Sequence, residues 1–284
     1  MGRLPNLPSL PNFRTLCASD GLSHLTTFTV DGAAKTNGAT VNLANGVTSV
    51  TIAATDGGSI TTGPAGNTGL STGDNSCTFT ITSEDGVTTL AVTINLHVLL
   101  PAPSLIDVSL DVGGGTEPTV GQVCTANPGT QTNCTSFTYI WKADGVAIPS
   151  ATLSTYTPTR ADAMGKALTC TVVGVNETGN TAPVTSNATS ATTGAPLNTA
   201  APVATSSGTT PALVGDTVTT TDGTWTGYPA PTFTYANNAT NGGTNNSVAA
   251  HLLDIGTAAI VFTVTATNSV GAVDADSNKV AVVA

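Results

Sequence analysis

Two stretches decide the fold: ALTCTVVGVNETG at residues 167–179 and AIVFTVTATNSVG at residues 259–271. In each, apolar and small polar residues alternate up to an asparagine, and a glycine follows three positions later. Alternation with a period of two is typical of a strand with one buried and one exposed face. Because the two stretches align without a gap, they predict one β-module used twice in tandem.

The similarity continues upstream of these two strands. One copy runs from Val120 to Gly179 and the other from Val214 to Gly271. Each contains a Val-Gly pair, a Phe-Thr-Tyr strand and an aspartate shortly before a glycine, at Val120–Gly121, Phe137–Tyr139 and Asp162–Gly165 in the first copy and at Val214–Gly215, Phe233–Tyr235 and Asp254–Gly256 in the second. Small β-modules in tandem usually space, decorate or bind, and they seldom catalyse.

The composition favours an all-β protein. Only 8% of the 284 residues are charged and 4% are aromatic, whereas about 25% of an average domain is charged. Thr and Val are abundant and suit pleated strands, and Gly, Asn and Pro supply turns. Many short strands are therefore expected.

The charge pattern argues against nucleic acid and membrane insertion. The net charge is −10, and the seven Lys and Arg residues are scattered along the chain, so they predict no basic patch. No window approaches the roughly 18 consecutive apolar residues of a membrane span. The first residues, MGRLPNLPSLPNF, lack the apolar core of a secretory signal peptide. We therefore expect the chain to stay in the cytoplasm where it is made, or to leave by another route.

Residues 1–16 are expected to form an extended arm. Proline recurs at every third residue from Pro5 to Pro11, and so does leucine from Leu4 to Leu10. This spacing matches the three-residue turn of a polyproline II helix, in which the leucines fall on one edge. Such an arm either remains a flexible tail or docks on a partner with little loss of entropy. The residues expected to anchor it are Leu4, Pro5, Leu7, Pro8, Leu10, Pro11 and Phe13.

Residues 17–100 predict a first β-domain that differs from the two repeats. Alternating segments predict strands at 25–30, 40–44, 48–55, 77–84 and 88–98. The Asp85–Gly86 pair predicts a hairpin turn between the last two of these strands. The segment 57–74, which is rich in Gly, Ser and Thr, predicts a loop.

The second half of this first domain resembles a known family. The stretch LSTGDNSCTFTITSEDGVTTLAVTINL at 70–96 is similar to the closing half of cadherin-like β-sandwich domains of bacteria and phages. Leu90 or Ala91 stands where that family usually has tyrosine. The residues that carry the match are Leu70, Gly73, Asn75, Glu84, Asp85, Gly86, Thr88 and Ile94.

Two proline-containing segments predict domain boundaries. Pro101 and Pro103 mark the first, and the stretch of small residues at 186–208 marks the second. Part of the second stretch is expected to form the last strand of the second domain and the first strand of the third. The predicted organisation is an arm at 1–16 followed by β-sandwiches at 17–100, 101–193 and 194–284.

The two repeats resemble bacterial and phage immunoglobulin-like domains, which implies a pair of such sandwiches. The second copy has Asn237 where the first has Trp141, and NNATNGGTNNS at 237–247 replaces its middle. The matching residues are Gly121, Tyr139, Trp141, Gly145, Ile148, Ala151, Thr152, Tyr156, Ala161, Asp162, Gly165, Val172, Asn176 and Gly179 in the first copy, and Gly215, Val218, Gly223, Trp225, Pro229, Pro231 and Tyr235 in the second.

Some of these residues are expected to be structural. Trp141 should fill the centre between two sheets, and Asp162 should use its carboxylate on nearby backbone N–H groups. Cys124 and Cys170 align with Val218 and Phe262, which favours buried thiols. The resemblance implies the alternative, a disulfide across the two sheets, which a reducing cytosol would oppose. The full set of expected core residues is Cys124, Trp141, Tyr156, Asp162, Cys170, Trp225 and Phe262.

The sequence predicts no catalytic residue, no cofactor and no metal. The three histidines have no metal-ligand spacing, and His97 is expected to be an ordinary strand residue. Five cysteines without a CxxC pair argue against zinc. No GxSxG, Walker or GxGxxG motif occurs. Asp274 and Asp276, with Asn278, offer fewer oxygen ligands than the six to eight that calcium takes.

The resemblance and the composition together imply a structural protein, not an enzyme. We expect a component of a bacteriophage virion: a capsid decoration or head-fibre protein on the particle surface, assembled in the host cytoplasm. Its expected partners are other virion proteins and further copies of itself, with host surface glycans at the immunoglobulin-like domains. A phage tail component and a bacterial surface adhesin or binding module are the alternatives. An enzyme such as a depolymerase would require a clustered pair of acids.

Overall fold

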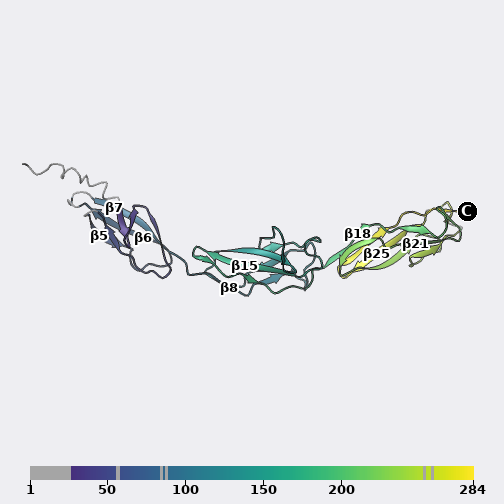
Figure 1. The fold of residues 1–284 in the computed structure, drawn as a ribbon, viewed down its shortest axis with the longest axis horizontal. Helices are drawn as coiled ribbons and strands as arrows, with labels where there is room; N and C mark the ends of the chain where they lie inside the picture. The colour runs from purple at the N-terminus through teal and green to yellow at the C-terminus, as the bar shows by residue number, and fades with distance from the viewer. Residues whose placement is uncertain (1–26, 56–57, 84–85, 87–88, 252–253, 257–258) are drawn as a thin grey trace, which may run out of the picture. The chain divides into compact units, whose positions relative to one another are not determined.

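The computed structural model describes residues 27–284, except 56–57, 84–85, 87–88, 252–253 and 257–258. Every named element in this part of the chain is a β-strand, which confirms the predicted all-β class (Figure 1). The chain divides into two compact units. Unit 1 ends at Pro103 and also includes Asn176–Gly179, and unit 2 holds Ser104–Val175 and Asn180–Ala284. The described residues contain no helix of the length and apolarity that crossing a membrane requires.

Unit 1 is a β-sandwich. Its strands are β1 (Thr27–Val30), β2 (Ala33–Thr36), β3 (Thr40–Leu43), β4 (Ile52–Ala54), β5 (Ser59–Ala65), β6 (Gly73–Thr82) and β7 (Thr89–Val98). One sheet has the order β2-β1-β4 and the other β3-β7-β6-β5. The pairing of β6 with β7 runs from Gly73 opposite Val98 to Thr82 opposite Thr89. The turn predicted at Asp85 lies outside the described residues.

The core of unit 1 follows from the alternation in its strands. Every second residue of β7 faces inward, so Val92, Ile94 and Leu96 are almost fully buried. The rings of Phe28 and Phe79 meet edge to face at 4.9 Å between centroids, a favoured geometry for aromatic pairs. The alternation of apolar residues in the sequence therefore predicts which side chains form the core of unit 1.

The prediction of a loop at 57–74 is wrong, because part of it forms β5. β5 pairs with β6 through a register that shifts between Ile60 and Ala65. The hydroxyls of Thr61 and Thr82 bond at 2.7 Å across the pair. A glycine- and threonine-rich segment can form an irregular edge strand because a bulge tolerates such residues. Composition alone did not reveal this.

The first sandwich of unit 2 contains the first repeat. Its strands are β8 (Ser104–Ile106), β9 (Ser109–Asp111), β10 (Cys124–Asn127), β11 (Thr130–Thr132), β12 (Ser136–Ala143), β13 (Val146–Ala147), β14 (Thr155–Tyr156), β15 (Leu168–Asn176), β16 (Gly179–Asn180) and β17 (Val184–Thr185). The main sheets have the orders β14-β10-β9 and β13-β12-β15-β16, and β17 also pairs with β15. Asp144 and Gly145 join β12 to β13 with positive φ angles of 48° and 79°, as an Asp-Gly hairpin requires.

The second sandwich of unit 2 contains the second repeat. Its strands are β18 (Gly194–Ala200), β19 (Ala204–Ser206), β20 (Ala212–Leu213), β21 (Thr217–Thr220), β22 (Thr224–Tyr228), β23 (Thr232–Asn237), β24 (Ser247–Ala249), β25 (Phe262–Asn268), β26 (Gly271–Asp276) and β27 (Val282–Val283). The larger sheets have the orders β19-β21-β24 and β23-β25-β26. The predicted boundary stretch 186–208 contains β18 and β19, which both belong to this second sandwich.

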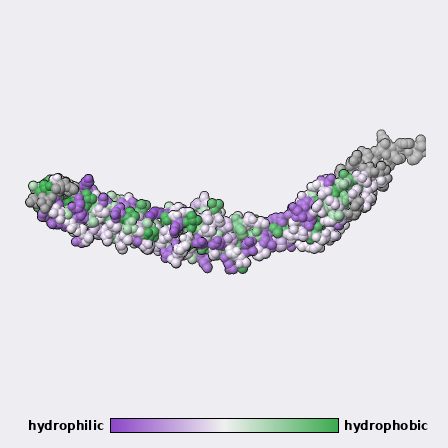
Figure 2. Space-filling view, turned by 180° about the vertical axis from the view of Figure 1, so that it is seen from behind, coloured by the Kyte–Doolittle hydropathy of each residue, from purple (hydrophilic) through white to green (hydrophobic). Residues whose placement is uncertain are grey.

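The exposed surface mixes apolar and polar residues. Figure 2 shows hydrophobic residues scattered among hydrophilic and neutral ones on the face in view. Exposed apolar side chains include Val146 and Leu153 in unit 2, at 71% and 70% exposure. Single exposed residues of this kind are common in folded proteins.

Candidate functional site

Three of the five expected core residues of the first repeat lie at the centre of its sandwich, whereas Tyr156 and Asp162 are only partly buried. Cys124, Trp141 and Cys170 have no exposed surface. Trp141 packs against the ring of Tyr156 at 5.6 Å between centroids, and its indole N–H donates to the carbonyl of Leu153 at 2.9 Å. Tyr156 itself is only partly buried. The tryptophan is held by packing on both sheets and by one hydrogen bond.

In the second repeat, some of the residues expected to be structural lie in the core of the sandwich, and Trp225 lies at its edge. Val218 and Phe262, which align with Cys124 and Cys170, are fully buried. Trp225 is half-buried and lies outside this core cluster. Its indole N–H donates to the carbonyl of Asp222 at 2.7 Å, and its ring lies 6.1 Å from that of Phe233.

The two aspartates that precede glycine act differently. The Asp162 carboxylate accepts a hydrogen bond from the Thr159 hydroxyl at 2.8 Å, so the structure shows a hydroxyl donor where backbone N–H donors were expected. Asp254 is buried and accepts from the backbone N–H groups of Thr240 and His251 at 2.9 and 2.8 Å. Asp254 therefore makes the contacts that were predicted for its counterpart.

The described cysteines are thiols. Cys77, Cys124 and Cys170 are buried, and Cys134 is partly exposed. Burial raises the pKa of Cys124 and of Cys170 to about 11. Both groups therefore stay protonated near neutral pH and react slowly, because the thiolate is the nucleophile. The fifth cysteine, Cys17, and the predicted anchoring residues of the arm lie outside the described residues.

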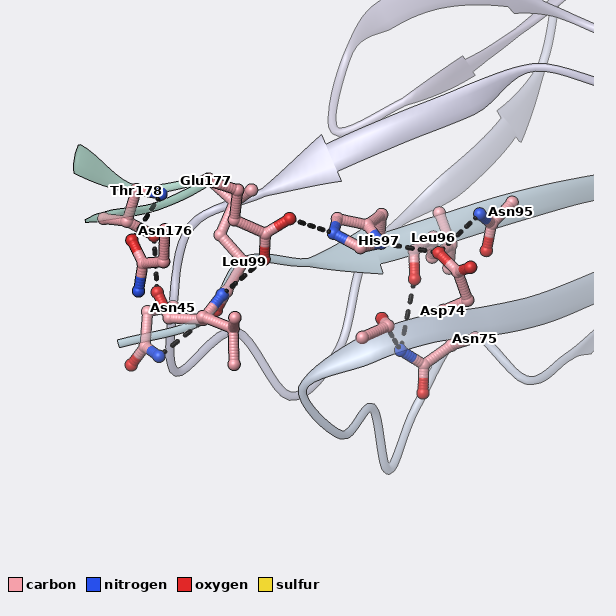
Figure 3. Close-up of polar contacts among 12 residues, drawn as sticks. Asn45, Asp74, Asn75, Asn95, Leu96, His97, Leu99, Asn176, Glu177 and Thr178 are labelled. Atoms are coloured by element: carbon pink, nitrogen blue, oxygen red, sulfur yellow. Dashed lines mark hydrogen bonds and ion pairs between the residues drawn. The ribbon is translucent and has the colours of Figure 1, made fainter. Parts of the chain in front are cut away.

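A polar cluster of unit 1 centres on His97. This residue is near the end of β7, and its Nδ1 lies 2.5 Å from Asp74 Oδ1 on β6. Its Nε2 lies 2.7 Å from Glu177 Oε2 in the turn Asn176–Gly179. Figure 3 shows the imidazole ring between the two carboxylates. Both ring nitrogens are thus engaged, an arrangement that requires two N–H groups and hence the protonated ring.

Each member of this cluster shifts the titration of the others. Hydrogen bonds to Asp74 and then to Glu177 raise the pKa of His97. Hydrogen bonds from Asn95 and then from His97 lower the pKa of Asp74. The backbone N–H of Leu100, followed by His97, lowers the pKa of Glu177. Asp74 is 70% exposed and Glu177 is 33% exposed, so solvent screens the Asp74 contact more.

Further bonds fix the turn Asn176–Gly179 to the chain that precedes the first repeat. Glu177 Oε1 accepts from the backbone N–H of Leu100 at 2.7 Å. The hydroxyl of Thr178 donates to the carbonyl of Leu100 at 2.5 Å. Asn176 Nδ2 donates to the carbonyl of Pro101 at 2.8 Å. Side chains of the turn thus bind consecutive backbone groups of the segment around Leu100.

Asn176 is the centre of an arrangement that we call the asparagine clasp. Its Oδ1 accepts from the backbone N–H groups of Thr178 and Gly179, while Nδ2 holds the preceding segment at Pro101. The side chain therefore shapes the turn and binds the segment that leads into the module. One residue performs both tasks because a carboxamide both donates and accepts.

The second repeat contains the same clasp. Asn268 Oδ1 accepts from the N–H groups of Val270 and Gly271. Its Nδ2 donates to the carbonyl of Gly194, where the segment leading into this module begins, and to that of Pro229. Ser269 stands where the first repeat has Glu177, so this copy has no equivalent acid.

The His97 cluster was not predicted from the sequence. His97 was expected to be an ordinary strand residue, and neither carboxylate lies near it in sequence. The repeat itself contained a signal, because Asn-Glu-Thr-Gly and Asn-Ser-Val-Gly differ by an acid at the turn. Only the fold brings that acid to His97.

No group of histidine, cysteine or carboxylate side chains in the described part of the chain is arranged to hold a metal ion. Asp274 and Asp276, weighed above as calcium ligands, accept hydrogen bonds from the hydroxyls of Thr265 and Thr263 at 2.6 and 2.7 Å. Each carboxylate of β26 thus accepts a hydrogen bond from a threonine directly opposite it on β25.

Comparisons with known proteins give structural likeness only. No family model and no curated protein matches the chain. Immunoglobulin domains 1–4 of Sidekick-1 match 90% of this chain and 76% of that one, with 15% identity and a TM-score of 0.29. A calcium-stabilised adhesin that helps an Antarctic bacterium bind ice matches over 91% and 64%, with 14% identity and a TM-score of 0.32. Extracellular domains 3–5 of Drosophila OTK match over 93% and 88%, with 12% identity and a TM-score of 0.32.

Proposed function

We propose that this chain is a non-enzymatic structural and binding protein, in which consecutive β-sandwiches display surfaces for attachment. The observation that supports this most directly is the repeated asparagine clasp. Asn176 and Asn268 each tie a module to the segment that leads into it. In both copies the side chain fixes the segment at the start of a module to a turn near its end, which suits a spacer or attachment protein built of repeated modules.

The His97 cluster supports the same proposal. Its ring nitrogens are bound by Asp74 and Glu177, so neither is free to accept a proton from a substrate. Glu177 is also engaged by Leu100. A histidine held in this way cross-links β7 to a turn, and it lacks the free nitrogen of a general base.

The more specific proposal is a bacteriophage virion component, a capsid decoration or head-fibre protein assembled in the host cytoplasm. Support comes from the resemblance of the repeats to phage immunoglobulin-like domains and of residues 70–96 to cadherin-like domains. The low fraction of charged residues also fits a particle surface built of hydroxyls and amides. The N-terminal arm would attach the chain to other virion proteins, and the immunoglobulin-like domains would contact host glycans weakly in many copies.

Purified particles test this proposal. Immunogold labelling of the intact chain should mark the capsid surface, and deletion of residues 1–16 should remove the label while the deleted chain still folds. Label confined to the tail would favour the tail component. Label on host cells and none on particles would contradict the virion proposal and favour an adhesin.

A further inference from the structure

None of the strands that the structure describes pairs with the outer edge of β23. This strand lies at the border of the sheet β23-β25-β26. The backbone N–H of Asn238, just past its end, donates to the carbonyl of Val261. In an antiparallel pair, residues alternate between those whose backbone faces the partner strand and those whose backbone faces away. By this alternation the N–H and C=O groups of Phe233 and Tyr235 point away from β25.

The corresponding strand of the first repeat is β12, in which Phe137 and Tyr139 stand where β23 has Phe233 and Tyr235. There β13 pairs with the end of β12. Trp141 donates its backbone N–H to the carbonyl of Ala151 and accepts from the N–H of Ile148. In the second repeat the stretch NNATNGGTNNS at 237–247 replaces that covering strand. That cover lies at Trp141 and beyond. At Phe233 to Tyr235 the sheet order of the described strands leaves β23 at the edge, so a partner can approach it there.

A groove lies along this edge. It has a volume of about 550 Å³ and is lined by Phe233, Thr234, Tyr235, Thr244, Asn245 and Asn246. The rings are fixed in place, because the Tyr235 hydroxyl donates to Asp222 and Phe233 packs on Trp225. The lining residues are uncharged. The groove thus combines fixed aromatic rings, side-chain amides and outward backbone N–H donors.

These features suit a proline-rich segment. Such segments present carbonyl acceptors and few N–H donors, and aromatic-lined grooves bind them because the polyproline II helix is already ordered. The chain supplies a segment of this kind in LPNLPSLPNF, residues 4–13, which is uncharged and has proline at every third position. An acidic or basic partner would find no opposite charge among the groove residues.

We propose that residues 4–13 of one copy of this chain dock in the β23 groove of another copy. The rings of Phe233 and Tyr235 receive the prolines and leucines, and Asn245 and Asn246 donate to the carbonyls of the arm. This inference rests on the proposed role of the arm as the attachment segment, and it adds that another copy is one surface to which the arm attaches. Because arm and groove are different patches, the contact can repeat from copy to copy.

Sedimentation equilibrium of the full chain provides the test. We expect the average mass to rise with concentration, and the triple variant P5A/P8A/P11A to remain monomeric. The variant alters only the arm, so misfolding of the β-sandwiches cannot explain a loss of association. A full chain that is monomeric at all concentrations, or a triple variant that associates like the parent, overturns the proposal.

The groove side is tested with a fluorescent peptide of residues 1–16 and the full chain. The double variant N245A/N246A should bind this peptide about tenfold more weakly, a change of about 1.4 kcal/mol. The matched control N127A/N180A removes two exposed amides outside the groove and should bind like the parent. Equal binding by both variants places the arm elsewhere and refutes the groove. If deletion of residues 1–16 still removes the chain from particles, only this inference fails and the proposed function stands.

Discussion

His97 Nε2 and Glu177 Oε2 lie 2.7 Å apart although 80 positions separate the two residues in the sequence. The contact joins the end of β7 to the turn between β15 and β16. Asp74 completes the cluster at Nδ1. Because two carboxylates contact one imidazole, they favour the protonated, positively charged form of the His97 ring.

Replacing Glu177 by glutamine should lower the pKa of His97, since its carboxylate is one of the two groups that raise it. Proton NMR titration of the His97 ring measures this directly. The control is Glu117→Gln, an exposed acid outside the cluster. An unchanged His97 pKa in Glu177→Gln would show that the contact is not formed in solution.

Stability should depend on pH through the same three residues. The pKa of His97 is raised above 6.5, so its contribution is complete below 6.5 and is lost as pH rises through the raised value. The lowered pKa values of Asp74 and Glu177 give contributions that are complete above 3.8 and 4.5 and are lost on acidification.

All three contributions therefore coexist between pH 4.5 and 6.5. Thermal melts of the parent and of His97→Gln should differ most in this window and converge at alkaline pH. A constant difference from pH 4 to 9 would contradict the protonated cluster.

Removing either asparagine clasp should destabilise its own module. Asn176→Ala and Asn268→Ala should each cost about 1 to 3 kcal/mol, because backbone N–H groups lose their acceptor. Asn176→Asp keeps the acceptor oxygen and loses the donor to Pro101, so it should cost less. Hydrogen exchange at Thr178 and Gly179 separates the two effects. Fast exchange in the aspartate variant as well would refute the assigned role of Oδ1.

The two tryptophans should differ in their effect on stability. Trp141 is fully buried, so Trp141→Ala should cost about 3 to 5 kcal/mol. Trp225 is half-buried at the rim, and Trp225→Ala should cost about 1 kcal/mol, a typical value for substitutions. Calorimetry of the individual unfolding transitions gives both values. A larger loss for Trp225 would show that the rim contacts with Phe233 matter more than burial.

Cys124 and Cys170 should resist thiol reagents in the folded protein, because burial raises both pKa values to about 11. Partly exposed Cys134 should react well before them. Peptide mapping after timed alkylation at pH 8 measures the order. A mass lower by two hydrogens, restored by reductant and mapped to these two positions, would instead reveal the disulfide that the family resemblance implied.

The sequence predicted those parts of the fold in which local pattern and burial agree. β7 alternates cleanly and its buried residues are all apolar, whereas β15 also buries the polar Thr171 and Asn176. β5 escaped notice because its pairing depends on bulges opposite β6, which no local pattern encodes. The core position of Trp141 followed from its place on an alternating strand and from the family resemblance, whereas the rim position of Trp225 depends on how β22 pairs with β18.

The polar contacts were less accessible to sequence reasoning. Asn176 and Asn268 stood out as conspicuous repeat residues, but their partners at Pro101 and Gly194 lie about 75 positions away. His97 showed no spacing signal because its partners come from a neighbouring strand and a remote turn. Such contacts depend on chain topology, and alternation reports only which face of a strand is buried.

The clasp has a consequence for how such chains grow. A module whose turn binds the chain that leads into it keeps this joint only when that chain is copied with it, because Pro101 and Gly194 lie upstream of the repeats that begin at Val120 and Val214. Gene duplication that includes this chain can lengthen the array without a new kind of connection. A single later substitution, such as the difference between Glu177 and Ser269, then makes one connection differ from the other.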